Sequence, residues 1–378
     1  MHLDLDLSHA VSRASAHTAR LIAIVATVAS PALPLLAQNT GRTFLPPPAA
    51  TVSTVPQNGD VNPYGTAFVG LYSDDRPQSF ENSVLQPGDL LVSNFNNNQN
   101  LQGTGTTIVR IDAHGQQTLF FQGSTQYAGL SGALGILRDG TVLVGNLRTF
   151  DGTSATATAG AIQIISPSGL LQTVITNAAI DGPWGMAVNE RDRWVDVFVS
   201  NVLNGTIARL SFRREHGWLT LEKSTVIATG LNHRGDPAAL ELGPSGLLYS
   251  EWNDTLYFAS SLDNAIYKIE HASTVGTGEA VPVLLFQDQV HLHGPLDLAV
   301  TPNGHLLVAN SDGSNVDPNQ PSEIVEYAAD GTFVTEFPVD PNNGGAFGIA
   351  TQSVGKATRL AAVDDNTATV TIYTEVNR

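Results

Sequence analysis

The sequence predicts an all-β fold: a six-bladed β-propeller with four antiparallel strands per blade, its ring closed by an N-terminal strand. Three observations predict this fold. Gly and Pro are frequent, with 35 and 20 residues, as in turn-rich β proteins. A turn followed by short apolar strands recurs six times along the chain, and the last of these units is one strand short.

Each unit opens with a turn that contains Gly or Pro and continues into a short apolar strand. The openings start at residues 62, 132, 182, 236, 294 and 345 and read NPYGTAF, GALGIL, GPWGMAV, DPAALEL, GPLDLAV and GAFGIAT. A second strand then ends in a polar residue, in chain order Asn94, Asn146, Asn201, Ser260, Asn310 and Asp364. A third, alternating strand follows, as in NGTIARLSF, and a fourth closes most units. Helical periodicity is almost absent, so this repeat favours a propeller over a sandwich.

The sixth unit supports the prediction through the strand that it lacks. It holds only three strands before Arg378, while the segment AATVSTVP, residues 49–56, precedes the first unit. Pairing of this segment with the last unit would tie the ring shut and remove an exposed strand edge.

Composition excludes several classes of function. The chain has 378 residues, of which 42% are hydrophobic, so it can bury a large core and is not disordered. Its net charge of -17 repels nucleic acid and anionic membranes, and neither is expected as a partner. The same field concentrates cations, although a surplus of acids also serves solubility alone. Cysteine is absent, which excludes disulfides and thiolate sites. There is no P-loop, and no nucleotide or flavin cofactor is expected.

The N-terminal region has the layout of a secretory signal. SRASAHTAR carries Arg13 and Arg20, the apolar stretch LIAIVATVA covers residues 21–29, and small or turn-forming residues follow. The apolar stretch is too short to span a bilayer. We therefore expect a signal peptide over 1–38, a linker over 39–48 and the propeller over 49–378. The mature protein is expected to be secreted or periplasmic, and monomeric.

Units such as GPWGMAV…VDVFVSNVLNGTIARLSF and GPLDLAV…GHLLVANSDG resemble NHL repeats, which have a Gly-Pro-x-Gly opening, an apolar strand and a polar strand end. More widely, residues 50–376 are similar to the six-bladed group of gluconolactonase-like hydrolases, strictosidine synthase-like proteins, peptide-amidating lyases and virginiamycin B lyase. The resemblance implies the fold. It does not choose an activity, because the group contains hydrolases, lyases and non-catalytic binding proteins.

In a propeller, the loops that enter each inner strand and leave each second strand open on one face around the central channel. We expect the ligand site at this channel mouth, with a polar rim and two aromatic residues at equivalent positions. The predicted ligand-binding residues are Tyr64, Asn94, Asn146, Trp184, Asn201, Arg234, Asn310 and Asp364. The alternative is structural: the amides and carboxylates bond the following turns, and the aromatic residues pack between blades.

Departures from the repeat suggest a metal site. Asp297 stands where other units have a small residue, and the fourth unit is interpreted as carrying Asp236 and Glu241 at positions that are elsewhere small. With His293 these carboxylates form a candidate site for a divalent metal. Oxygen ligands alone favour Ca²⁺, and added histidine favours Zn²⁺. The alternative is that the acids pair with arginines or backbone amides.

His233 and His293 lie in neighbouring lead-in segments, LNHRGDP and VHLHGP, and are the predicted catalytic residues. The leading hypothesis is an exported hydrolase or lyase with a metal-assisted site for a small molecule at the channel mouth. The rival hypothesis is a non-catalytic scaffold that binds a glycan, a peptide or a protein.

Overall fold

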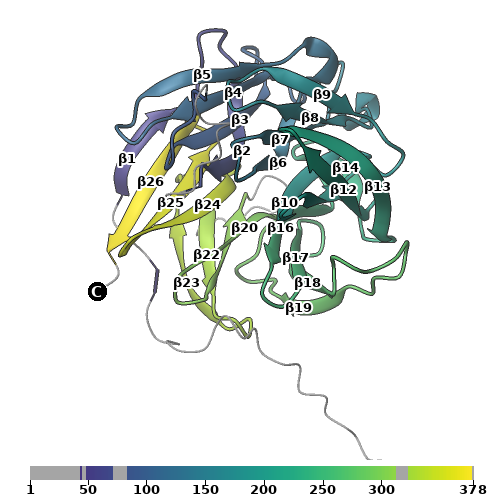
Figure 1. The fold of residues 1–378 in the computed structure, drawn as a ribbon. Coiled ribbons are helices and arrows are strands. Elements are labelled where there is room, and N and C mark those ends of the chain that lie inside the picture. Colours follow the sequence, from purple (N-terminus) through teal and green to yellow (C-terminus); the bar gives the residue numbers. More distant parts are fainter. Residues whose placement is uncertain (1–42, 45–47, 71–82, 312–321, 377–378) are drawn as a thin grey trace, which may run out of the picture. The chain divides into compact units, whose positions relative to one another are not determined.

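A computed structural model describes residues 43–44, 48–70, 83–311 and 322–376. Within these residues the fold is all-β, with six four-stranded antiparallel sheets in a ring and one extra two-stranded hairpin (Figure 1). The predicted fold class is confirmed. Two short 3₁₀ turns lie in loops, Thr125–Tyr127 between the first and second blades and Ser154–Thr156 within the second blade. No helix in the described part of the chain is long and apolar enough to cross a membrane.

The first three blades follow the chain in order. Blade 1 consists of β2 (Val61–Phe68), β3 (Leu90–Asn96), β4 (Thr107–Ile111) and β5 (Gln117–Gln122). Blade 2 consists of β6 (Leu130–Ile136), β7 (Val142–Asn146), β8 (Ala161–Ile165) and β9 (Leu171–Ile175). Blade 3 has the longest strands, β10 (Pro183–Arg191), β11 (Trp194–Asn201), β12 (Thr206–Glu215) and β13 (Trp218–Ala228).

The hairpin of β14 (Arg234–Asp236) and β15 (Leu240–Leu242) separates blade 3 from blade 4. Blade 4 consists of β16 (Pro244–Ser250), β17 (Thr255–Ser260), β18 (Ala265–Glu270) and β19 (Val283–Gln287). Blade 5 consists of β20 (Pro295–Val300), β21 (Leu306–Asn310), β22 (Glu323–Tyr327) and β23 (Phe333–Pro338). Blade 6 consists of β24 (Ala346–Val354), β25 (Ala357–Asp364), β26 (Thr369–Val376) and, from the other end of the chain, β1 (Pro48–Ser53).

The same strand register recurs at the start of every inner strand. Near its start, each inner strand pairs with the predicted polar end of the second strand, as in Pro183 opposite Asn201 and Pro295 opposite Asn310. In all six blades a register shift follows directly after this pair. Such irregularities bend the strand and increase its twist. The repeat therefore gathers all six polar strand ends on one face of the ring, as predicted.

Ring closure by the N-terminal strand is confirmed. β1 pairs antiparallel with β26, with Val52 opposite Val370 and Ser53 opposite Thr369, and Val52 packs against the apolar cluster between blades 6 and 1. Phe44, inside the predicted linker, is 2% exposed and packs between blades 5 and 6. Its backbone N–H donates to the Glu326 carboxylate over 2.8 Å. Part of the predicted linker is thus packed against the propeller.

Apolar clusters lie between each pair of consecutive blades. Near the axis, serine hydroxyls join one inner strand to the next: Ser131 donates to the Pro183 carbonyl over 2.6 Å, and Ser245 to the Pro295 carbonyl over 2.9 Å. The backbones are close here. A Cβ added to Gly348 in blade 6 would lie 1.9 Å from the Tyr64 carbonyl oxygen in blade 1. The small residues of the openings are therefore required by packing between blades.

The interpretation of the fourth unit is wrong. Residues 236–242 are not an inner strand but the turn and second strand of the β14–β15 hairpin, in which Asp236 pairs with Leu240. The inner strand of blade 4 begins at Pro244, within the sequence Gly-Pro-Ser-Gly that starts at Gly243. Gly246, not Ala239, therefore occupies the crowded position near the axis, where its added Cβ would lie 2.5 Å from the Cα of Asp297.

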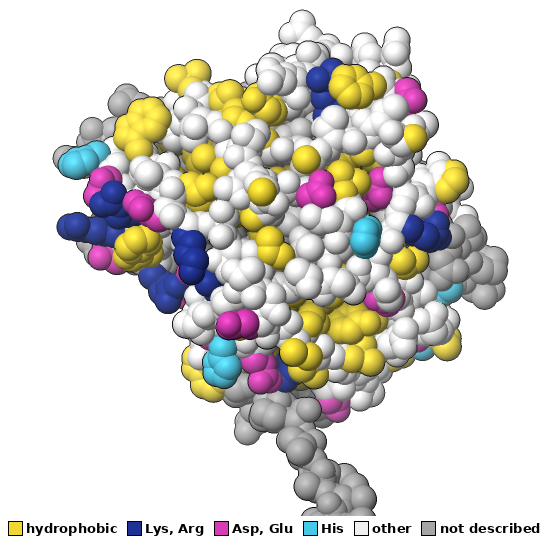
Figure 2. All heavy atoms as spheres, turned by 90° about the vertical axis from the view of Figure 1, so that its right-hand side faces the viewer, with side chains coloured by type: hydrophobic (Ala, Val, Ile, Leu, Met, Phe, Trp, Pro, Cys, Tyr) yellow, Lys and Arg dark blue, Asp and Glu magenta, His cyan; other side chains and the backbone are white. Residues whose placement is uncertain are grey.

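Charged side chains of both signs lie together on the side of the ring drawn in Figure 2, where Lys and Arg gather mostly at one edge beside Asp and Glu. The long strands of blade 3 carry several ion pairs, including Arg214 with Glu190 and Arg213 with Glu222. Local acids neutralise these two arginines.

Candidate functional site at the channel mouth

A pocket of about 110 Å³ opens at the end of the ring where the polar strand ends gather. It receives residues from blades 1, 3, 5 and 6 and from the β14–β15 hairpin, so it lies at the axis of the ring. Its main side chains are Asn62, Tyr64, Trp184, Leu296, Phe347 and Asp365. The repeat explains this convergence, because each of four side chains directly follows the inner-strand residue that pairs with the polar end of the second strand: Tyr64, Trp184, Leu296 and Phe347.

Aromatic rings form the floor of the mouth pocket. The Tyr64 ring centroid lies 5.2 Å from that of Trp184, 4.7 Å from that of Phe347 and 5.6 Å from that of Phe95. Tyr64, Phe95 and Trp184 are buried, whereas Phe347 is partly exposed. Edge and tilted contacts of this kind hold the rings rigidly. The prediction that Tyr64 and Trp184 line the mouth agrees with this arrangement, and both also pack in the core.

Two buried polar atoms at the mouth pocket have no hydrogen-bond partner among the described residues: Asn62 Oδ1 and Trp184 Nε1. The side chains are 7% and 2% exposed. The Trp184 ring N–H lies close to the Tyr64 hydroxyl but not in hydrogen-bond geometry. Leaving a buried polar atom unpaired costs about 1–3 kcal/mol, so these two atoms indicate a place where a ligand or water bonds.

Two carboxylates with raised pKa values stand near the Tyr64 hydroxyl. Burial, with a smaller contribution from the neighbouring Asp364, raises the pKa of Asp365 to about 7. Burial also raises the pKa of Asp297 to about 7, against the lowering effect of the Ile349 and Leu298 N–H groups, each 2.9 Å from a carboxylate oxygen. Burial raises the pKa of Tyr64 well above its usual value, and both carboxylates add to this shift.

Asp365 differs from Asp297 in what surrounds its carboxylate. Asp297 lies on inner strand β20 and links blade 5 to blade 6 through Ile349. Asp365 lies in the turn between β25 and β26 and lines the mouth pocket, and no described residue donates a hydrogen bond to its carboxylate. Asp365 is therefore the carboxylate available to a ligand.

The β14–β15 hairpin reaches over the mouth. Its turn accepts a hydrogen bond at the Ala238 carbonyl from Gln102 Nε2 of blade 1 over 3.1 Å, and Glu241 accepts one from Ser154 of blade 2. Leu240 is buried in the same apolar cluster as Tyr64 and Trp184, with a φ of 63°. A leucine in this left-handed region is strained, so packing of Leu240 against the aromatic floor holds the hairpin in place.

The four predicted metal ligands do not come together, and the proposed quartet is wrong. Asp236 and Glu241 lie on the hairpin, whereas Asp297 lies on an inner strand with both oxygens bonded to backbone N–H groups. Asp236 also pairs with Arg234 over 2.9 Å. Among the described residues, no group of three or more His, Asp or Glu side chains could hold a metal ion. The error follows from aligning 236–242 as an inner strand.

The predicted catalytic histidines lie outside the lining of the mouth pocket. His293 Nε2 contacts the Val290 carbonyl at 3.1 Å, and its backbone N–H donates to Asn310 Oδ1 over 2.7 Å. His233 is exposed, and its Nδ1 contacts the Leu231 carbonyl at 3.0 Å. Both histidines thus hold the lead-in segments on which they lie, and their catalytic role stays a prediction.

The rim amides are structural in their contacts. Asn94, Asn146, Asn201 and Asn310 are at most 1% exposed, and each Nδ2 donates to a backbone carbonyl of the segment that precedes the inner strand of its blade. Asp364 instead accepts from the following turn, at Asn366 N and Thr367 Oγ1. Arg234 is exposed and pairs with Asp236. Binding of a ligand by these six side chains stays a prediction.

Sequence reasoning missed Asn62, Phe347 and Asp365. A signal existed for two of them. Phe347 follows Ala346 in GAFG as Trp184 follows Pro183 in GPWG, and the sixth unit has two acids, Asp364 and Asp365, where most units have one Asn. Asn62 has no such signal, because an asparagine before a proline reads as an ordinary turn residue, which its left-handed φ of 59° also suits.

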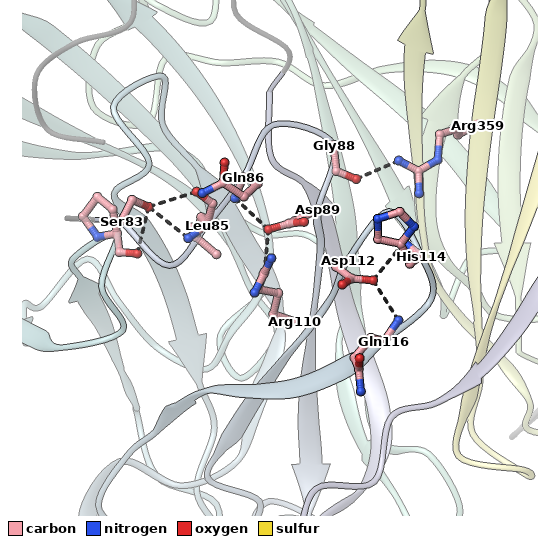
Figure 3. Close-up of polar contacts among 11 residues, drawn as sticks. Ser83, Leu85, Gln86, Gly88, Asp89, Arg110, Asp112, His114, Gln116 and Arg359 are labelled. Atoms are coloured by element: carbon pink, nitrogen blue, oxygen red, sulfur yellow. Dashed lines mark hydrogen bonds and ion pairs between the residues drawn. The ribbon is translucent and has the colours of Figure 1, made fainter. Parts of the chain in front are cut away.

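Two other hollows lie away from the mouth pocket. One of about 480 Å³ lies between blades 1 and 6 and is lined by Gly88, Asp112 and Arg359 among others. Figure 3 shows that its polar groups hold the fold: Asp112 accepts from the His114 and Gln116 N–H groups, and Arg359 donates to the Gly88 carbonyl. The other, about 300 Å³, lies between blades 4 and 5 and is lined mainly by apolar side chains. Neither combines an acidic group with unpaired polar atoms as the mouth pocket does.

Comparison with known proteins shows the fold alone. No protein-family model matches the chain, and no curated protein sequence matches it. Among solved structures, a gluconolactonase from Xanthomonas campestris is 10% identical, with a TM-score of 0.51 over 89% of this chain and 99% of that one. An α-L-arabinanase from Penicillium chrysogenum complexed with arabinobiose is 12% identical, with a TM-score of 0.51 over 88% and 99%. The chain is a six-bladed β-propeller.

The raised pKa of Asp297 predicts how stability depends on pH. An unfolded aspartate has a pKa of about 3.9, so between about pH 4 and 7 the folded chain holds a proton that the unfolded chain has released. The free energy of unfolding should therefore fall as the pH rises through this range. Asp297→Asn should flatten this slope without abolishing it, because Asp365 contributes in the same direction.

Urea unfolding at several pH values from 4.5 to 8 measures this slope. Asp330→Asn is the matched control, since Asp330 lies in an exposed turn, bonded only locally to Thr332. The control should keep the wild-type slope. A slope in Asp297→Asn equal to that of the wild type would contradict the buried, protonated carboxyl group.

Proposed function

We propose that this protein is a small-molecule hydrolase whose site is the mouth pocket and whose acid–base group is Asp365. One observation supports this proposal above all: a carboxyl group with a pKa of about 7 faces a pocket that also contains unpaired buried polar atoms. A group that titrates near neutral pH can both accept and return a proton during one reaction.

The chemistry follows from the Asp365 carboxylate and the Trp184 N–H. The Asp365 carboxylate accepts a proton from water while the water oxygen bonds to the electrophilic carbon of the substrate. The bond from that carbon to the leaving oxygen then breaks, and the carboxyl group returns the proton to this oxygen. The Trp184 N–H is free to donate a hydrogen bond to the oxygen on which negative charge develops.

The predicted divalent metal forms no part of this mechanism. The carboxylates chosen for it do not converge, and the one on the axis, Asp297, has both oxygens bonded to N–H groups of the backbone. His233 and His293 could assist only through movement of the lead-in segments, since neither lines the pocket.

Activity of Asp365→Asn tests the proposal. The purified protein is assayed against lactones, carboxylic esters and glycosides. For the class that is hydrolysed, Asp365→Asn should lower kcat about a hundredfold or more, with a smaller change in KM, because proton transfer is lost. Asp330→Asn should leave both constants unchanged. If every class resists hydrolysis while a ligand still binds at the mouth, the rival hypothesis of a non-catalytic scaffold stands.

We also propose that the units are of NHL type and that the mature protein is secreted or periplasmic and monomeric. The Gly-Pro-x-Gly openings at Gly182 and Gly243 support the first proposal, and the basic, apolar and small-residue order of 1–38 supports export. The mass of the exported chain should correspond to a start near Gln38. A mass that includes residues 1–37 would contradict cleavage there.

A further inference from the structure

We propose that the mouth pocket binds a small organic cation, through an ammonium group held over the aromatic floor beside Asp365. This inference rests on the mouth pocket being the functional site, as proposed above, but not on hydrolysis. It names the chemistry of the ligand, which neither the fold nor the comparisons indicate.

The first argument is charge. No Lys, Arg or His lies among the described residues that line the pocket, whereas Asp365 does, with Asp297 close to Tyr64. Further acids stand behind Asp365: Asp364 is next to it, and Asp340 raises the pKa of Asp364 in addition to burial. Like charges in a dry site oppose one another, so a bound cation would relieve this repulsion.

The second argument is the floor. The faces and edges of Tyr64, Trp184 and Phe347 meet at the pocket, with Phe347 partly exposed. Aromatic faces attract cations by about 0.5–2 kcal/mol, most strongly where water is excluded, and recognition of quaternary ammonium groups uses such surfaces. A neutral apolar group would pack on the same rings but would leave the carboxylates uncompensated.

The third argument is the pair of unpaired polar atoms. Asn62 Oδ1 is an acceptor and, like the Asp365 carboxylate, favours a ligand with positive charge. The Trp184 N–H is a donor, which an ammonium group cannot satisfy. The ligand should therefore carry an oxygen atom close to its ammonium group, as in an amino alcohol or its ester.

The size of the pocket agrees with this class. A volume of about 110 Å³ is well below the roughly 300–1,000 Å³ of pockets that enclose drug-sized ligands. It accommodates a single small group rather than an oligosaccharide. The β14–β15 hairpin, held by Gln102 and Ser154, limits the room above it.

Isothermal titration with choline chloride, and with its neutral isostere 3,3-dimethylbutan-1-ol, tests the charge directly, because the two probes have nearly the same shape. Choline should bind at least tenfold more tightly than the isostere. Its affinity should rise between pH 6 and pH 8, as Asp365 loses its proton. Asp365→Asn should weaken choline binding at least tenfold, and Asp330→Asn should leave it unchanged, with folding of both variants verified by thermal unfolding.

Equal binding of the two probes, or no binding of choline, would overturn the inference. Calcium chloride is the third probe: tight Ca²⁺ binding that excludes choline would assign the acids to a metal ion instead. The outcomes are separable from those for hydrolysis. Choline binding without turnover of any substrate class supports the cation site and refutes the hydrolase. Asp365-dependent hydrolysis of neutral substrates without choline binding supports the hydrolase and refutes the cation site.

Discussion

A chain that starts at Gln57, and so lacks β1 and Phe44, is expected not to fold into a stable ring. β26 would lose its partner strand, including the pairs Val52–Val370 and Ser53–Thr369, and would present an open edge. The apolar cluster between blades 5 and 6 would lose the buried Phe44 ring, a loss that in other cores costs about 3–5 kcal/mol when Phe is replaced by Ala. Together these losses rival the total stability of a typical domain.

Soluble yield and thermal unfolding measure this effect. The matched control is a chain that starts at Gln38, which keeps Phe44 and β1 and should unfold like the full-length protein. A synthetic peptide of residues 43–56 added to the shortened chain should restore part of its stability, since closure requires the strand and not its covalent link. A shortened chain with an unchanged unfolding temperature would refute closure by β1.

Gly348→Ala is expected to destabilise the propeller by more than about 3 kcal/mol. The new methyl group would lie 1.9 Å from the Tyr64 carbonyl oxygen, which belongs to the backbone of the neighbouring inner strand. Neither backbone can move away easily, because each inner strand is hydrogen-bonded to the second strand of its own blade, β2 to β3 and β24 to β25. Since Tyr64 also forms the floor of the mouth pocket, ligand binding should weaken as well.

Urea unfolding of Gly348→Ala and Gly217→Ala separates crowding from backbone strain. Gly217 has a φ of 79° and no heavy atom within 4 Å of an added Cβ, so its substitution should cost only about 1 kcal/mol from strain. Gly185, whose added Cβ would lie 2.3 Å from the Ser245 carbonyl oxygen, should behave like Gly348. Equal small losses at all three positions would contradict tight packing at the axis.

The fold could be predicted because its signals are local and repeated. Six polar strand ends, from Asn94 to Asp364, recur at similar spacing, and each marks the same register in its blade. One local ambiguity led to an error. DPAALEL, from Asp236, is interpreted from the sequence as the opening of the fourth unit, although Gly-Pro-Ser-Gly from Gly243 matches the Gly-Pro-x-Gly pattern better, and the pairing of β16 with β17 confirms the second position.

The sequence predicted two of the residues that line the mouth pocket, but not its acidic group. Tyr64 and Trp184 were chosen from their equivalent positions, and both line it. Asp365 was not predicted, because its raised pKa comes from burial and from Asp364 beside it, and its neighbour Tyr64 lies some three hundred residues earlier in the chain. A pKa depends on everything within a few ångströms, and sequence spacing reports little of that.

Strand periodicity, turn residues and the missing last strand are properties of short segments. The amino-acid sequence alone therefore predicts six blades and a closed ring. The groups that line the mouth pocket, in contrast, are brought together only by the tertiary structure. Asn62, Trp184, Phe347 and Asp365 come from three blades, and the hairpin that covers them breaks the repeat. Their convergence, the unpaired atoms and the raised carboxyl pKa arise from packing between distant segments, which no local pattern encodes.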